Sequence, residues 1–247
     1  MSSFSDSALA AWDLIVRGDA ALWAIVARSL GVSAAACALA CGFGVALGAL
    51  LGVGRFAGRG AVLTVLNTLL AVPSVVVGLV VYLLLSRSGP LGFLGLLFTF
   101  EAMVLAQSVL VLPVAAALTR QVVEDSERPH GEQLASLGAG TALRALLLAW
   151  HERYALLTVA IACFGRAVSE VGAVMIVGGN IDGFTRVMTT AIALETSKGD
   201  LALALALGIV LLAVVLALNA LVALLRRWRL SRGDAAVLPR AGAEVAA

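Results

Sequence analysis

Charged residues are scarce in this 247-residue chain: they make up 13% of it, against 62% hydrophobic residues. A soluble domain usually has about 25% charged and about 45–50% apolar residues. With a mean hydropathy of +1.05, the composition excludes a soluble fold. Apolar runs of roughly 20 residues recur along the chain, and each is long enough to cross a hydrocarbon core of about 30 Å. The sequence therefore predicts an all-α, polytopic membrane protein.

Lysine, histidine and cysteine are almost absent, which removes several kinds of chemistry. The one lysine, Lys198, is followed by glycine and aspartate, so the Gly-Lys-Ser/Thr sequence of a phosphate-binding loop is excluded. The cysteines fall in apolar runs without a paired set of ligands, which favours small buried side chains over a metal site. They are Cys37, Cys41 and Cys163. We expect no metal, no cofactor and no enzyme activity, and if ATP drives this protein, a separate chain hydrolyses it.

Five apolar segments are expected to cross the membrane as one domain, residues 1–247. They cover approximately residues 30–53, 61–85, 98–118, 154–177 and 201–225. Residues 8–29, which include two tryptophans and two arginines, are expected to form an interfacial segment. Pro73 lies inside the second span, where a proline kinks a helix. The Ala-rich tail after Arg232 is expected to be disordered.

Positive residues divide unequally between the two sides of the membrane. One side holds the 55–59 turn, a polar segment at 121–153 and the tail. Its eleven positive residues are Arg55, Arg59, Arg120, Arg128, Arg144, Arg153, Arg226, Arg227, Arg229, Arg232 and Arg240. The other side has five, which are Arg17, Arg28, Arg87, Arg186 and Lys198. Since cytoplasmic loops carry the excess of arginine and lysine, we expect the N-terminus outside and the C-terminus in the cytoplasm.

The polar segment 121–153 must lie outside the bilayer. Pro129 fits only the first turn of a helix, so a short helix is expected to begin at His130. Gly138 supplies the backbone freedom for a sharp turn at the end of this helix. A second helix is expected over residues 141–150. We call this helix–turn–helix the knob.

Leu134 and Leu137 are expected one turn apart on a single face of the first knob helix. An amphipathic helix resting on the lipid surface accounts for that pattern. However, Glu132 is followed by Leu-Gly-Ala, with Gly138 six positions after the glutamate. This spacing resembles the coupling loop of ABC-importer permeases, in which a short helix docks into a groove on a cytoplasmic ATPase. The resemblance implies ATPase-coupling roles for Glu132, Leu134, Leu137 and Gly138.

Arg166 and Glu170 are charged residues inside the fourth apolar segment, four positions apart on one helical face. Each alone costs about 2.5–3.5 kcal/mol at mid-bilayer, so we expect them to pair or to face a wet cavity. A neutralised pair that locks the span to its neighbours is favoured over a pathway or gate element, because a permanent carboxylate repels an anion. Ser169 lies beside them without a histidine or lysine base, so an intramembrane protease is not expected.

The segment 178–200 is expected on the outer face and is denser in polar residues than packing requires. Its neutral donors and one positive charge would suit an anion crossing the mouth of a pathway. These pathway or gate candidates are Asn180, Thr185, Arg186, Thr189 and Thr190. Turn and cap duties explain Asn180 and Thr185 equally well.

Residues 164–173, Phe-Gly-Arg-Ala-Val-Ser-Glu-Val-Gly-Ala, and 178–181, Gly-Gly-Asn-Ile, resemble the molybdate/tungstate/sulfate group of ABC permeases. The run 185–200 is similar to the tungstate branch of that group. The similarity covers about residues 19–225. The sequence departs from the family twice: Gln133-Leu134 replaces two alanines of the coupling loop, and no proline stands near Trp150, where the family often has one.

The resemblance implies a permease subunit of an ATP-driven oxyanion importer with the type I ABC-importer permease fold. The expected substrate is tungstate, with a molybdate or sulfate permease as the alternative. Implied partners are a cytoplasmic ABC ATPase subunit, an extracytoplasmic oxyanion-binding protein and a second copy in a homodimer. A multi-pass position in the cell (inner) membrane is expected, and no nucleic-acid partner.

A secondary transporter without an ATPase would need an inverted repeat or an ion-coupling carboxylate in a broken helix, neither of which is clear. A purely structural membrane subunit would not need the outer polar segment.

Overall fold

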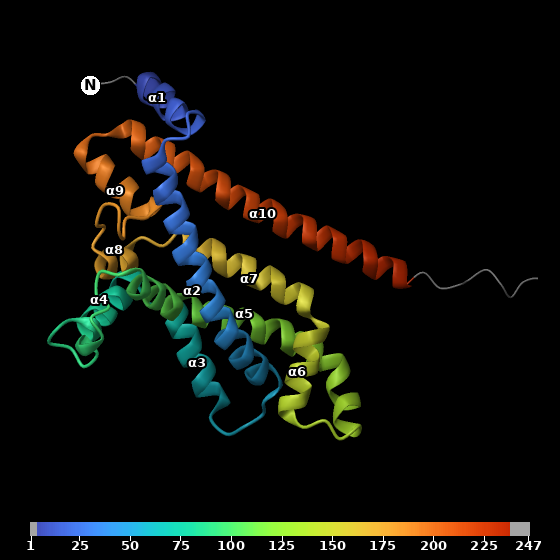
Figure 1. Ribbon diagram of the computed structural model, residues 1–247. Helices are drawn as coiled ribbons and strands as arrows, with labels where there is room; N and C mark the ends of the chain where they lie inside the picture. The colour runs from blue at the N-terminus through green and yellow to red at the C-terminus, as the bar shows by residue number, and fades with distance from the viewer. Residues whose placement is uncertain (1–3, 238–247) are drawn as a thin grey trace, which may run out of the picture.

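The computed structural model describes residues 4–237, and every regular element within them is a helix (Figure 1). The α-helices are α1 (Phe4–Val16), α2 (Ala20–Val53), α3 (Arg59–Leu70), α4 (Ser74–Leu85), α5 (Phe100–Ser136), α6 (Thr141–His151), α7 (Arg153–Val168), α8 (Gly172–Gly178), α9 (Met188–Lys198) and α10 (Leu201–Val237). A short 3₁₀ helix, η1 (Gly92–Leu94), lies between α4 and α5. The expected all-α class is confirmed.

Three of the described helices, α2, α5 and α10, are long and apolar enough to cross a membrane alone. Two bent pairs, α3 with α4 and α6 with α7, raise the number to five if each pair counts as one span. The chain is therefore a multi-pass membrane protein. The end of α5, α6 and the α2–α3 turn lie at one end of the molecule, and α1 and α9 lie at the opposite end (Figure 1).

The first long helix begins earlier than the sequence suggests. α2 starts at Ala20, so residues 8–29 do not form a single interfacial segment. Gly18, at φ +70°, makes the turn after α1, and the Asp19 carboxylate accepts a hydrogen bond from the N–H of Leu22 at 2.8 Å. This cap satisfies a free donor at the helix start. Only α1 remains as a separate short helix, and it packs against α10.

The core of the bundle is the contact between α2 and α5. It depends on Gly44, Gly48 and Gly52, which are spaced about one turn apart on α2. At Gly44, an added Cβ would lie 2.6 Å from the Cβ of Ala115. At Gly52, it would lie 3.0 Å from the Cβ of Val123. Small residues at such positions let two helix backbones approach closely inside a membrane.

Pro73 separates two helices instead of only kinking one. α3 and α4 meet at an angle of 98°. Proline removes a helical N–H donor and disfavours the helical conformation in the residue before it. α4 then packs against α8, where a Cβ added to Gly78 would lie 2.7 Å from the Cα of Ala173.

The expectation that Pro129 opens a new helix is wrong. α5 runs without interruption from Phe100 to Ser136 and contains both Pro113 and Pro129. Pro129 is exposed, so water can bond the carbonyl group that its missing N–H leaves without a partner. The first part of the knob is therefore a continuous helical extension of a membrane span.

The fourth expected span, 154–177, is broken in two. α7 has 16 residues and is about 24 Å long, too short for a core of about 30 Å. Backbone groups freed by the break find partners from distant helices. The Gln107 side chain donates to the carbonyl of Ala167 at 3.0 Å, and the Thr189 hydroxyl donates to the carbonyl of Glu170 at 2.7 Å. Irregular backbone inside a membrane is tolerated only when its polar groups find hydrogen-bond partners of this kind.

The last helix diverges from the bundle. α10 runs beside α7 and away from the rest of the bundle (Figure 1). It carries exposed leucines along much of its length. It continues beyond the expected span to Val237, so the chain remains helical past Arg232. The rest of the expected disordered tail, 238–247, lies outside the described residues.

Candidate functional site

The knob ends its first helix with a glycine turn, as expected. Gly138 has φ +82°, and its N–H donates to the carbonyl of Ala135 at 2.9 Å. The N–H of Ala139 donates to the carbonyl of Leu134 at 3.0 Å. A side chain with a Cβ rarely adopts this backbone conformation, so glycine sets the direction in which the chain turns toward α6.

The two leucines of the knob do not share a face. Leu134 packs against a buried cluster contributed by α2, α5 and α6, whose members are Ala49, Val53, Val123, Ala145 and Leu148. Leu137 is 82% exposed at the tip. Glu132 is also exposed, on the edge of a cavity. Leu134 therefore anchors the knob to the bundle, while Leu137 is free to contact a partner.

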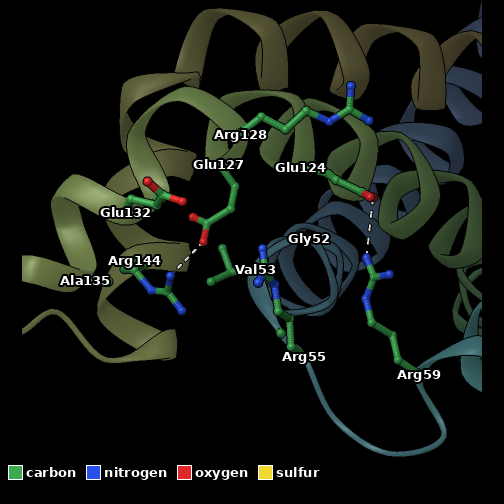
Figure 2. A pocket seen from close by; sticks show the side chains of 12 residues that line it. Gly52, Val53, Arg55, Arg59, Glu124, Glu127, Arg128, Glu132, Ala135 and Arg144 are labelled. Carbon is green, nitrogen blue, oxygen red and sulfur yellow. Dashed lines mark hydrogen bonds and ion pairs between the residues drawn. The ribbon is translucent and has the colours of Figure 1, made fainter.

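Two ion-pair groups fasten the knob to the membrane helices (Figure 2). Arg144 of α6 lies 2.7 Å from Glu127 of α5, and both side chains are largely buried. Glu124 pairs with Arg59 of α3 at 3.4 Å and with Arg120 one turn earlier in α5. These contacts join α3 and α6 to the same stretch of α5.

A polar cavity of about 440 Å³ lies between these groups. Figure 2 shows Glu127 and Arg144 pointing toward one another, with the Glu132 carboxylate nearby and Arg128 extending away from the pair. Arg55, from the turn after α2, lines the opposite wall. Among the described residues, no group of three histidine, cysteine or acidic side chains could hold a metal ion. The cavity is a mixed-charge recess beneath the knob.

The intramembrane pair forms at the break between α7 and α8. Arg166 Nη1 lies 2.8 Å from Glu170 Oε2. The Glu170 side chain is buried, and its other oxygen accepts from the N–H of Ala173 at 3.3 Å, at the start of α8. The Ser74 side chain, at the start of α4, is a further hydrogen-bond partner. The carboxylate therefore joins three helices, as expected for a locking pair, whereas the Arg166 side chain remains 46% exposed.

The three threonines of the outer segment are buried and bonded within the chain. The Thr185 hydroxyl donates to the carbonyl of Gly178. Thr189 bonds the carbonyl of Glu170, and Thr190 accepts from the N–H of Val187 at 3.2 Å, capping α9. None of the three presents its hydroxyl to an open mouth in the described structure.

Asn180 and Arg186 are likewise engaged in the loop. Asn180 adopts φ +51° and donates to the carbonyl of Thr190 at 3.3 Å. Arg186 lies between two carboxylates, 3.1 Å from Asp182 and 3.7 Å from Glu195, and its side chain is 13% exposed. The outer candidates are brought together, but mainly by bonds that shape the loop.

Comparison with known proteins decides the family. No family model matches the chain. It is 45% identical over 205 residues to the probable anion ABC transporter permease protein of Haloferax volcanii, which covers 81% of this chain and 88% of that protein. The chain belongs to the ABC transporter permeases of this anion type. This permease is also 41% identical over 223 residues to the tungstate uptake system permease protein TupB of Peptoclostridium acidaminophilum, covering 90% of the chain and 97% of that protein. The Campylobacter jejuni protein of the same name is 42% identical over 163 residues, covering 66% of the chain and 68% of that protein.

The site of this permease contains ion-paired residues that sequence reasoning missed. Arg120 and Glu124 are spaced four apart on one helix, a signal that was available in the sequence. Glu127 and Arg144 are 17 residues apart, and nothing local indicates that they meet. The bend of 79° between α6 and α7 also forms without the proline that the family often has there. Glu152 keeps a hydrogen bond from its N–H to the carbonyl of Leu148 at 2.9 Å through this bend.

Proposed function

We propose that this permease is the membrane subunit of an ATP-driven tungstate importer that works as a homodimer. The observation that carries the proposal is the near full-length match to a protein named as a tungstate uptake permease, at 41% identity over 223 residues. A second relative with the same printed name supports it. The Haloferax volcanii protein, named only for anions, is consistent with the same substrate class. ATP is hydrolysed on a separate cytoplasmic chain.

The knob docks on that ATPase. Leu137 is the apolar side chain that enters a groove of the partner, because it is 82% exposed at the tip of a rigid helix extension. Gly138 sets its direction, and Glu132 borders the same surface. Leu134 couples indirectly, by anchoring the knob to the spans.

Movement of the knob passes to the spans through the contacts beneath it. α5 is continuous from the membrane to the tip, so a push at Leu137 acts on a single rigid rod. Glu124 and Glu127 connect this rod to α3 and α6. ATP binding and hydrolysis then bias a two-state equilibrium between inward-open and outward-open dimers.

The opposite end of the molecule receives the anion from an extracytoplasmic binding protein. Asn180, Thr185, Thr189 and Thr190 act as gate residues by holding the shape of the segment that follows α8. Arg186 contributes a weaker attraction than an unpaired arginine, because two carboxylates flank it. Selectivity between tungstate and related anions rests chiefly with the binding protein.

The test is uptake of labelled tungstate into vesicles that contain the permease, its ATPase and the cognate binding protein. We expect ATP-dependent uptake, with molybdate as the next best competitor and sulfate behind it. Uptake of an amino acid or a sugar, unaffected by tungstate or molybdate, would overturn the substrate proposal. Tungstate uptake that continues without ATP would overturn the importer mechanism.

A further inference from the structure

Arg166 presents a charge outward from within a membrane-spanning segment. Its side chain is 46% exposed, whereas that of its partner Glu170 is 4% exposed. An arginine facing hydrocarbon at this depth costs about 2.5–3.5 kcal/mol on insertion scales. The bond to Glu170 involves Nη1, so the rest of the guanidinium has to meet water or another chain.

The exposed face of α7 around Arg166 is small and polar. Ser169 and Ala162 are exposed on this face, and Thr158 is half-buried one turn further along. The two hydroxyls donate to carbonyl groups of their own helix, from Ser169 to Gly165 at 3.0 Å and from Thr158 to Tyr154 at 3.3 Å. The opposite face of α7 is apolar and packs against α2 and α5 through Val159, Cys163 and Ala167. α7 therefore separates a dry core from a polar surface.

A cavity of about 330 Å³ lies between α7 and α10 beside this surface, and its lining includes neither Arg166 nor Ser169. Thr158, Ala162 and Gly165 form one wall, and Leu218 and Asn219 belong to the other. The two helices pack loosely, since a Cβ added to Gly165 would lie 4.0 Å from the nearest atom of Leu218. Thr158 and Asn219 thus place one polar side chain from each helix on the wall of a cavity whose other lining residues are apolar.

We infer that this face of α7 is a wall of the anion pathway, and that Arg166 is the positive charge that a tetrahedral dianion passes. The inference rests on the proposed function and assigns its pathway. Glu170 lies behind Arg166, bonded to Ala173 and Ser74, so it holds the guanidinium in place without facing the anion. A single cation attracts a dianion but does not trap it, as conduction requires. The chain leaves this face open, and a second copy closes the pathway.

Removing the charges of Arg166 and Glu170 distinguishes a role in the anion pathway from a purely structural role of the ion pair. Arg166→Gln alone leaves a buried carboxylate without its cation, so the informative variant is Arg166→Gln with Glu170→Gln, which is neutral. We expect this double variant to insert and to copurify with the ATPase, yet to take up tungstate about tenfold more slowly than the parent, because focusing of the anion is lost. The matched control is Arg17→Gln with Asp13→Asn, which removes an exposed ion pair of the same i,i+4 spacing outside the spans and away from the knob. Parental uptake by the Arg166/Glu170 double variant would overturn the inference.

Water access tests the same wall without using transport. Ala162→Cys places a thiol on the inferred wall, and Leu212→Cys places one on α10 at a position that is 70% exposed. In membranes holding the dimer and its ATPase, we expect a charged, membrane-impermeant thiol reagent added to both faces to modify Cys at 162 and not at 212. The parent chain, whose cysteines are buried or half-buried, sets the background. Equal reactivity of the two variants, or no reaction at 162, would overturn the inference.

These outcomes are distinct from failure of the proposed function. If the parent transports a different anion, the substrate proposal fails while modification at position 162 still supports the wall. If the parent transports tungstate and position 162 stays unreactive, the importer stands and the pathway lies elsewhere.

Discussion

Arg144 and Glu127 form an ion pair of 2.7 Å across a separation of 17 residues in the chain. The pair closes the knob on itself, because one residue belongs to α6 and the other to the extension of α5. A movement of the tip should therefore move both helices together. In the proposed mechanism, this contact holds α6 to the α5 extension that leads into the membrane.

Breaking the pair should uncouple the two helices. Glu127→Gln and Arg144→Gln each leave a largely buried charge without its partner, which should cost about 1–3 kcal/mol. The double variant should recover part of this loss, giving an interaction energy of about 1 kcal/mol. The measurements are the thermal unfolding midpoint and the ATPase activity of the purified complex. Strictly additive single effects would mean that the pair does not couple the helices.

The turn at Gly138 should tolerate no side chain. Gly138→Val places a β-branched residue at φ +82°, a conformation that costs roughly 1–2 kcal/mol or more for an L-residue. Gly140 is a matched control in the same turn, because its φ of −68° and ψ of +169° suit valine. We expect Gly138→Val to lower binding-protein-stimulated ATP hydrolysis and Gly140→Val to leave it near the parent rate. The reverse order would refute the role given to the turn.

Leu137 and Leu134 should differ in what they affect. Leu137→Ala should weaken copurification of the ATPase without changing thermal stability, since the side chain is 82% exposed. Leu134→Ala should instead lower stability by about 2 kcal/mol, because it removes packing from the cluster beneath the knob. Pull-down yield and thermal unfolding of the same preparations separate the two effects. A loss of stability in Leu137→Ala with intact ATPase binding would contradict the docking assignment.

The orientation can be tested with two positions of equal exposure. Leu137 at the knob and Phe93 in the loop between α4 and α5 are both 82% exposed. In intact cells that produce the permease without its ATPase, an impermeant thiol reagent should modify Phe93→Cys at once and Leu137→Cys only after permeabilisation. Labelling of Leu137→Cys from outside would place the knob on the wrong side for a cytoplasmic ATPase.

Local signals in the sequence predicted the features that depend on neighbouring residues. Proline at 73 and glycine at 138 act through their own backbone. Gly138 makes the expected turn, and Pro73 makes a full break between two helices where a kink was expected. Pro129 shows the limit of this reasoning. A proline inside an exposed helix segment is tolerated when the flanking residues hold the helix, so its presence does not mark a helix start.

Features that depend on distant partners could not be read from the sequence. The break after α7 contains no proline and is held by Gln107 and Thr189, which lie far from it in the chain. The outer threonines have the composition of a polar pathway, but the fold turns their hydroxyls inward to carbonyl groups. The half-exposed position of Arg166 likewise depends on how the helices pack, which the sequence does not show.

Copurification tests the central claim most directly. The tagged permease is extracted gently from its native membrane, in a form that still transports tungstate after reconstitution. We expect an ABC ATPase chain to copurify with it in equal number. Leu137→Asp, which places a charge at the docking tip, should lose that chain while still inserting in the membrane. A parent permease that purifies without any ATPase and still transports tungstate in vesicles lacking ATP would contradict the account.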